Sequence, residues 1–142
     1  MNMEIKQICK RLVIAGALLI LAIKLIIRPL YFEDDPAKFF FGIAPNFFAS
    51  FLMPFAVYWL FNCKDFSIAR ILKIQSPYDL RLVCLIGLGM LIINEYLQLI
   101  PFLGRTFDYF DIIFSAIGLA AAYFVFGKIQ SYKKRSYEIN AN

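Results

Sequence analysis

Four apolar stretches, each long enough to cross a bilayer as a helix, constrain this chain of 142 residues more than any other feature. A transmembrane helix needs about 20 mainly apolar residues. Hydrophobic residues make up 61% of the sequence and charged residues only 18%, which is below the usual share in soluble domains. The sequence therefore predicts an integral membrane protein with spans at residues 12–28, 39–61, 80–100 and 109–127.

The fold class follows from the chemistry of the backbone in lipid. A helix satisfies its own amide and carbonyl groups, whereas an isolated strand leaves an unpaired edge. The sequence has no alternating barrel pattern. We expect an all-α membrane protein with a single domain over residues 1–142, in which four transmembrane helices form a compact bundle. Residues 129–142 form a short basic tail.

The basic residues predict the orientation of this bundle. Eleven of the fifteen Lys and Arg residues precede the first span, lie around the connection between the second and third, or follow the fourth. Cytoplasmic segments carry such an excess, so both termini are expected in the cytoplasm. These residues form no continuous patch with interleaved aromatic side chains, so nucleic acid is not an expected partner.

The outward connection between the third and fourth spans carries ionisable side chains, which are rare near hydrocarbon and are by default candidates for a functional site. Glu95 and Gln98 share one face near the end of the third span. Arg105 lies in the connection, and its planar guanidinium can engage carboxylates. Asp108 and Asp111 stand at the opening of the fourth span. Together these side chains predict an outward-facing polar pocket.

Two residues of the other spans are further candidates for this pocket. Lys24 lies in the outward half of the first span, where it either balances the acids or extends to the outer interface. Asn46 follows Pro45 near the outer start of the second span, and we interpret it either as a helix cap or as a pocket residue. Pro54 is expected to kink that span and open space beside the pocket.

Part of this region also has a structural interpretation. Asp108 is a favoured N-cap residue for the fourth span. A stripe of small residues on that span would let another helix approach closely, and Gly87 and Gly89 of the third span can supply the partner. The stripe begins at a carboxylate and consists of Asp111, Ser115, Gly118 and Ala122.

The chain has three cysteines and no histidine. The absence of His excludes His-based acid–base catalysis and His metal sites. Cys9, Cys63 and Cys84 have no metal-ligand spacing, and we expect them to serve packing, with palmitoylation of Cys9 as the alternative. The sequence predicts no cofactor and no dedicated metal site, although the acids could hold a divalent cation.

The spacing in the polar segment resembles that of the VanZ-like family of small bacterial membrane proteins. The resemblance covers residues 95–118 and implies a bacterial cell membrane and a link to resistance to the glycopeptide teicoplanin. It depends on a pattern with short gaps: Glu95-x-x-Gln98, Pro101-x-x-Gly104-Arg105, Asp108-x-x-Asp111 and Gly118.

The chain departs from the family pattern at two places. The family often has a charged segment with His opening a preceding helix, where this chain has residues 44–48 without charge. Ser115 replaces the usual Asn of the last helix. If the family site uses His as a proton carrier, this chain works through carboxylates instead or has lost that function.

We therefore expect a membrane protein whose outward-facing pocket binds a lipid-linked or other cell-envelope ligand. Its other partners would be membrane lipids. Whether the chain forms a homo-oligomer is left open by the sequence. One alternative is a structural module in which Glu95, Arg105 and Asp111 form a salt-bridged clasp. Another is a hydrolase of lipid phosphates or esters, with Glu95 or Asp111 as the general base.

Overall fold

The computed structural model describes residues 2–30, 36–62, 67–97 and 108–140. No strand occurs in these four ranges, and the expected all-α class is confirmed. The helices in chain order are α1 (Asn2–Ala22), the π-helical turn η1 (Ile23–Ile27), α2 (Arg28–Leu30), α3 (Pro36–Phe61), α4 (Ser67–Leu72), α5 (Pro77–Leu97) and α6 (Tyr109–Asn140).

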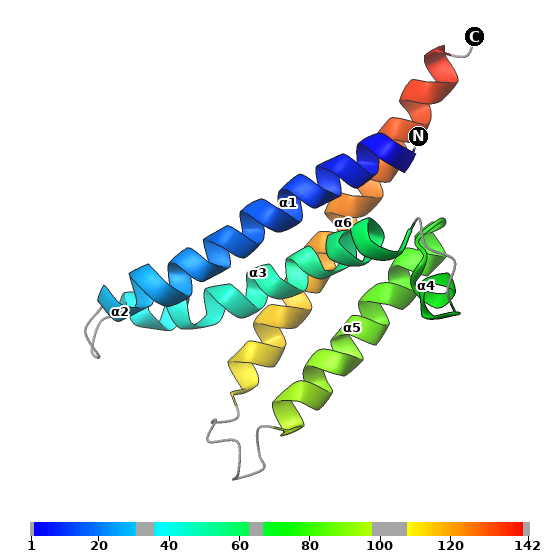
Figure 1. Ribbon diagram of the computed structural model, residues 1–142. Coiled ribbons are helices and arrows are strands. Elements are labelled where there is room, and N and C mark those ends of the chain that lie inside the picture. The colour runs from blue at the N-terminus through cyan, green and yellow to red at the C-terminus, as the bar shows by residue number, and fades with distance from the viewer. Residues whose placement is uncertain (1, 31–35, 63–66, 98–107, 141–142) are drawn as a thin grey trace.

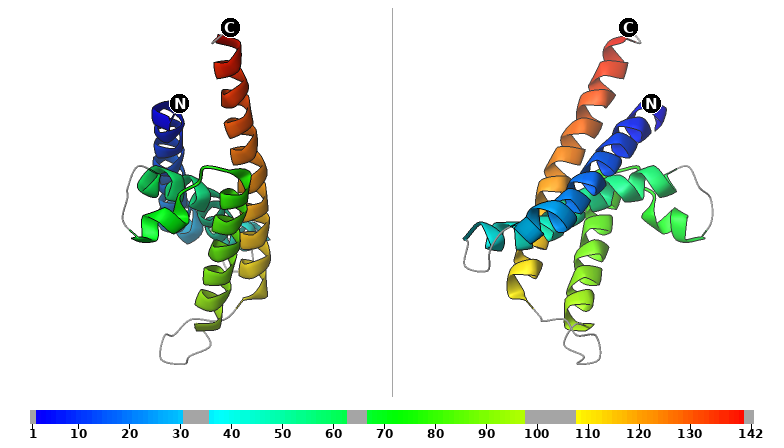
Figure 2. Two further views of the ribbon diagram at one scale, coloured as in Figure 1. Left: turned by 90° about the vertical axis from the view of Figure 1, so that its right-hand side faces the viewer. Right: turned by 60° about the vertical axis from the view of Figure 1, so that its left-hand side comes forward.

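Helix α3 is the centre of the bundle, because it packs against both α1 and α6 (Figure 1). Helix α5 lies along α6, and α3 crosses α6 steeply (Figure 2). The start of α1 and the last turns of α6 point to the same end of the bundle in all views. Helices α1 and α3 run in opposite directions, as do α5 and α6.

Although they cross, helices α3 and α6 run in the same overall sense, as their ring contacts show. Near the start of both helices, the ring centroids of Phe39 and Phe110 are 5.3 Å apart. Further along both helices, the rings of Phe55 and Phe126 are 5.4 Å apart. Both pairs meet edge to face, which is a favoured geometry for aromatic rings.

The hydrophobic core lies toward the end of the bundle that carries the termini. Phe55 and Phe126 are almost fully buried there, and Tyr58 adds a second edge contact to Phe126. Cys9 from α1 and Val83 from α5 close the same cluster. Every long helix thus contributes to one core.

Helices α3 and α6 approach each other closely at Gly118. A Cβ atom at this position would collide with the Ser50 hydroxyl and lie 2.5 Å from the carbonyl oxygen of Phe47. That hydroxyl donates a hydrogen bond of 2.9 Å to the same carbonyl. Small residues let transmembrane backbones approach in this way, and buried hydroxyls need a local acceptor. The glycine is therefore required by contact with α3.

The prediction that the third span packs against the small-residue stripe of the fourth span was wrong in part. At Gly118 the stripe faces α3, and the adjacent face of α6 is the one that meets α5. A Cβ atom on Gly87 would collide with the Met53 side chain of α3, so this glycine also serves contact with α3. Gly89 has nothing within 4 Å of its Cβ position.

Three helices in the described ranges are long and apolar enough to cross a membrane, at Phe39–Phe61, Pro77–Leu97 and Tyr109–Tyr132. The span predicted at 39–61 coincides with one of them. The other two differ in their limits: α5 begins three residues before 80, and α6 continues as a helix through the predicted basic tail to Asn140. The first predicted span, 12–28, is not among the three.

The apolar stretch of that first span is divided between three helical segments. Helix α1 starts with the charged residues Lys6, Lys10 and Arg11, and it ends at Ala22. The helix then continues through η1 and α2 without a break up to Leu30. Pro29 lacks an amide hydrogen and its ring clashes with the preceding turn, which explains a widened π-helical turn directly before it.

Helix α5 starts earlier than predicted because of a capping box. Pro77 is its first residue, and Ser76 is the cap: the Ser76 hydroxyl accepts a hydrogen bond of 3.2 Å from the backbone N–H of Asp79. The Asp79 carboxylate in turn accepts bonds of 2.8 and 2.9 Å from the N–H groups of Ser76 and Gln75. Such reciprocal bonds satisfy amides that a helix start leaves open.

We predict that Gly118→Ala lowers the free energy of unfolding by about 1–3 kcal/mol, the usual cost of overpacking a tight contact. Unfolding in mixed micelles with increasing dodecyl sulfate, followed by circular dichroism, measures this loss. The matched control is Gly89→Ala, whose Cβ meets open space and which should be neutral or gain up to about 1 kcal/mol in helix propensity. Equal stability of the two variants would contradict the proposed close approach.

The Cys9 thiol is expected to resist alkylation in the folded protein. It is 1% exposed, and burial raises its pKa to about 11. At pH 8 the thiolate fraction falls from about a tenth for an ordinary thiol to about a thousandth. Mass spectrometry of the Cys9 peptide should show reaction with iodoacetamide slowed at least about a hundredfold relative to the denatured chain. Equal rates would place the thiol outside the core and leave palmitoylation of Cys9 open.

Candidate functional site

The end of α5 and the start of α6 flank the connection that carries the predicted pocket. Glu95 lies in the last turn of α5 and is only 8% exposed. Its neighbours Asn94 and Tyr96 are exposed. The carboxylate-bearing residue therefore occupies the buried side of a helix whose flanking positions face outward.

Asp108 caps the start of α6. Its Oδ1 atom accepts a hydrogen bond of 2.9 Å from the backbone N–H of Phe110, and its carbonyl oxygen accepts one of 3.2 Å from Asp111 N–H. This is the bonding of an N-cap residue to the first turn of its helix. The structural interpretation of Asp108 is thus supported.

Asp111 lies in the first turn of α6 and is half-buried. A carboxylate in this turn complements the positive end of the helix dipole. One turn further, Ser115 is 4% exposed, so the side of α6 that continues from Asp111 turns into the protein. Along this side of α6, burial therefore increases from the half-buried Asp111 to the buried Ser115.

Asn46 lies inside α3, ten residues after the helix start at Pro36, and does not cap it. Helix α3 continues through Pro45 and Pro54 without interruption. Asn46 lies on α3 between two residues that contact α6. Phe39 before it contacts Phe110, and Phe47 after it approaches Gly118. Half-buried Asn46 directly precedes Phe47, so it lies closer to the level of Gly118 than to that of Asp111.

The other candidates lie at the edge of this region or beyond it. Lys24 is exposed and belongs to the π-helical turn η1. Gln98 and Arg105 lie outside the described residues, so the pairing of Arg105 with a carboxylate stays a prediction. In the part of the chain that is described, no group of three or more Cys, Asp or Glu side chains is placed to hold a metal ion.

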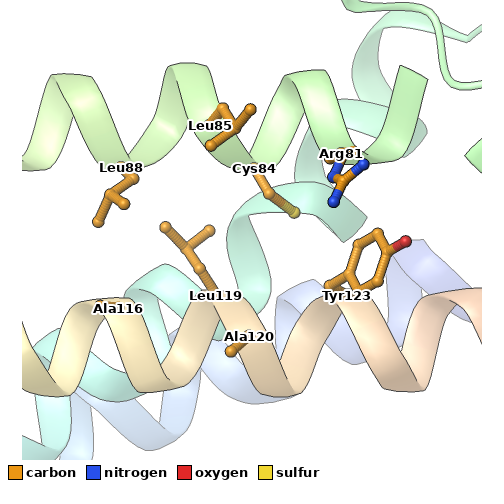
Figure 3. A pocket seen from close by; sticks show the side chains of 8 residues that line it. All are labelled: Arg81, Cys84, Leu85, Leu88, Ala116, Leu119, Ala120 and Tyr123. Carbon is orange, nitrogen blue, oxygen red and sulfur yellow. The ribbon is translucent and has the colours of Figure 1, made fainter. Parts of the chain in front are cut away.

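The structure has a hollow that the sequence did not predict. It lies between α5 and α6, toward the end of the bundle that carries the chain termini (Figure 3). Its volume is about 260 Å³. The available signal was the pair of small residues Ala116 and Ala120, one turn apart on α6. The residues that line the hollow are Arg81, Cys84, Leu85, Leu88, Ala116, Leu119, Ala120 and Tyr123.

Comparisons with protein-family models, curated proteins and solved structures find no match for this chain. The resemblance to the VanZ-like family therefore remains a prediction that depends on the residues of the polar segment alone.

The capping role of Asp108 predicts different effects for two substitutions. Asp108→Ala removes the acceptor for the Phe110 N–H and should lower the free energy of unfolding by about 1 kcal/mol. Asp108→Asn retains an acceptor oxygen and should remain within a few tenths of a kcal/mol of the original protein. Dodecyl sulfate unfolding measures both, and an equally large loss in the Asn variant would assign the effect to charge instead of capping.

Proposed function

We propose that this chain is a bacterial plasma-membrane protein with four spans and that its outer end binds a lipid-linked or other cell-envelope ligand. Three spans are the apolar helices α3, α5 and α6. The fourth is the helix formed by α1, η1 and α2, whose continuous 2–30 stretch includes residues 12–27, which are apolar except for Lys24. The continuous helix over residues 2–30 is long enough to cross a bilayer.

The charge distribution supports an orientation with both termini in the cytoplasm. The outer end would then carry Lys24 and Arg28 together with Glu95, Asp108 and Asp111. An excess of Lys and Arg marks the cytoplasmic side of membrane proteins. The end of the helices that carries the termini bears most of the described cations: Lys6, Lys10, Arg11, Arg70, Lys73, Arg81 and Lys128.

The burial of Glu95 carries the proposal. Most of helix α5 is not buried within the bundle, yet its one acid near the outer end lies on the buried side. A carboxylate at this depth is costly unless it serves a partner or a ligand, and such residues usually face the protein interior. We assign the half-buried Asp111 at the start of α6 and Asn46 on α3 to the same polar surface.

Within this pocket, Arg105 is assigned to a phosphate or another anionic group of the ligand. Guanidinium groups bind phosphate in a bidentate manner that Lys cannot reproduce. Glu95, Asp111 and Gln98 would hold Arg105 in position, and Lys24 would add a second cation at the rim. The resemblance to VanZ-like proteins supports an envelope role and suggests teicoplanin as the antibiotic to examine.

A structural clasp is the second candidate, and the capping bond of Asp108 favours it. Asp108 thus has a structural role at the start of α6. Glu95 and Asp111 would likewise have a structural role if both formed salt bridges with Arg105 and so held α5 and α6 together. Under this interpretation the charges would stabilise the fold and bind no ligand.

The test compares four variants in lipid nanodiscs with a polyprenyl phosphate as the probe. Arg105→Ala should weaken binding about tenfold or more, because hydrogen bonds to charged groups contribute about 1.5–3 kcal/mol. Glu95→Gln and Asp111→Ala should weaken it less. The control Asn94→Ala changes an exposed neighbour on α5 and should bind normally. Unchanged binding by all four folded variants would overturn the ligand site.

The charge-exchanged double variant Glu95→Arg with Arg105→Glu separates the two candidates. A clasp tolerates the exchange, so folding and teicoplanin susceptibility of the host should return to those of the original protein. A ligand pocket does not tolerate it, because the cation is displaced from the anionic group of the ligand. Recovery of both properties would favour the clasp.

A further inference from the structure

The hollow between α5 and α6 has a polar end and an apolar end (Figure 3). The Arg81 guanidinium and the Tyr123 hydroxyl group lie together at one end. Leu88 of α5 lies at the other end, across from Ala116 of α6. Since α5 rises 1.5 Å per residue, Arg81 and Leu88 are separated by roughly 10 Å along the helix.

The floor and walls of this groove come from the sequence of α6 and α5. Ala116 and Ala120 are too small to fill the space between the helices, while Leu85, Leu88 and Leu119 stand beside it. Small side chains one turn apart on a helix therefore leave a channel that runs along the helix axes. Its lining is apolar everywhere except at the end with Arg81 and Tyr123.

The polar end of the groove lies toward the side of the chain termini, near the start of α5 and in the later half of the Tyr109–Tyr132 span. Arg81 is the fifth residue of α5, which starts at Pro77, and it is exposed. Tyr123 lies nine residues before the end of the Tyr109–Tyr132 span. Arginine and tyrosine extend their polar groups toward the interface from such positions.

The charges near the polar end suit an anion. Lys128 is exposed one to two turns beyond Tyr123 on α6. The nearest acid on α5 is Asp79, whose carboxylate accepts hydrogen bonds from Gln75 and Ser76. Arg81 is thus a cation at the mouth of an apolar channel, with a phenolic hydroxyl group as a second hydrogen-bond donor.

We propose that this groove binds one anionic glycerophospholipid from the leaflet on the side of the chain termini. An acyl chain would lie along the leucine and alanine side chains, and the lipid phosphate would contact Arg81 and the Tyr123 hydroxyl group. A phospholipid has this same order of groups, with an anionic headgroup at the interface and an apolar chain below it.

A second copy of the chain is a less suitable occupant. In a two-fold dimer the same surface meets itself, so two Arg81 side chains would approach each other. Like charges in a region of low dielectric repel strongly. A lipid brings the opposite charge to this position, which favours it over self-association through the groove.

This lipid site is separate from the proposed outer pocket. Arg81 and Glu95 are fourteen residues apart on α5, which is roughly 21 Å along the helix. The groove requires a membrane location but does not depend on Arg105, Asp111 or a cell-envelope ligand. Its test can fail or succeed independently of the pocket.

The experiment uses the full chain in nanodiscs of phosphatidylcholine with a minor share of phosphatidylglycerol, and native mass spectrometry counts retained lipids after release into detergent. The original protein should retain one phosphatidylglycerol. Arg81→Gln should reduce the preference for phosphatidylglycerol about fivefold, the contribution of one basic residue near an anionic membrane. Ala120→Phe fills the channel and should abolish retention of either lipid.

Two controls keep the result interpretable. Arg70→Gln removes an exposed cation of α4 outside the groove and should retain phosphatidylglycerol normally. Circular dichroism must show that Ala120→Phe is folded; the smaller Ala120→Leu replaces it if it is not. Retention of the lipid by folded variants with a filled groove would overturn the proposal. A dimer cross-linked through cysteines placed at Ala116 would also overturn it, because the groove would then hold a second copy.

Discussion

The approach of α3 to α6 at Gly118 is the contact on which the rest of the bundle depends. Helix α1 packs mainly on α3 and α5 mainly on α6, so the seam between α3 and α6 joins the two pairs. Between helices in lipid the hydrophobic effect supplies little driving force, and close packing of small residues replaces it. The missing side chain at Gly118, set against Ser50 and the Phe47 carbonyl, allows that close packing.

The directions of the helices determine where polar groups can meet. Because α5 and α6 lie side by side and run in opposite directions, the end of α5 and the start of α6 come to one end of the bundle. Glu95 and Asp111 lie there, whereas Arg81 and Tyr123 lie toward the other end. Two chemically different regions, one acidic and one cationic with an apolar channel, therefore share the same pair of helices.

The sequence predicted those features that follow from one helix at a time. The all-helical class and the span at 39–61 depend on length and hydropathy, and the cap at Asp108 depends on local bonding, so all three agree with the structure. The start of α5 at Pro77 had a readable signal in Ser76, Pro77 and Asp79. Contacts between helices were harder to predict from the sequence. Both the helix that meets Gly118 and the groove beside Ala120 depend on how the surfaces of different helices pair. Glu95 is buried, while its predicted pairing with Arg105 lies beyond the described residues.

The seam also implies a way of assembly. The bundle consists of two antiparallel pairs, α1 with α3 and α5 with α6, each of which buries part of its own surface before the pairs meet. Docking of the two pairs then brings the Gly118 side of one against the Ser50 side of the other. A chain severed between α3 and α5 would therefore leave the residues of the α3–α6 seam intact, one side on each half.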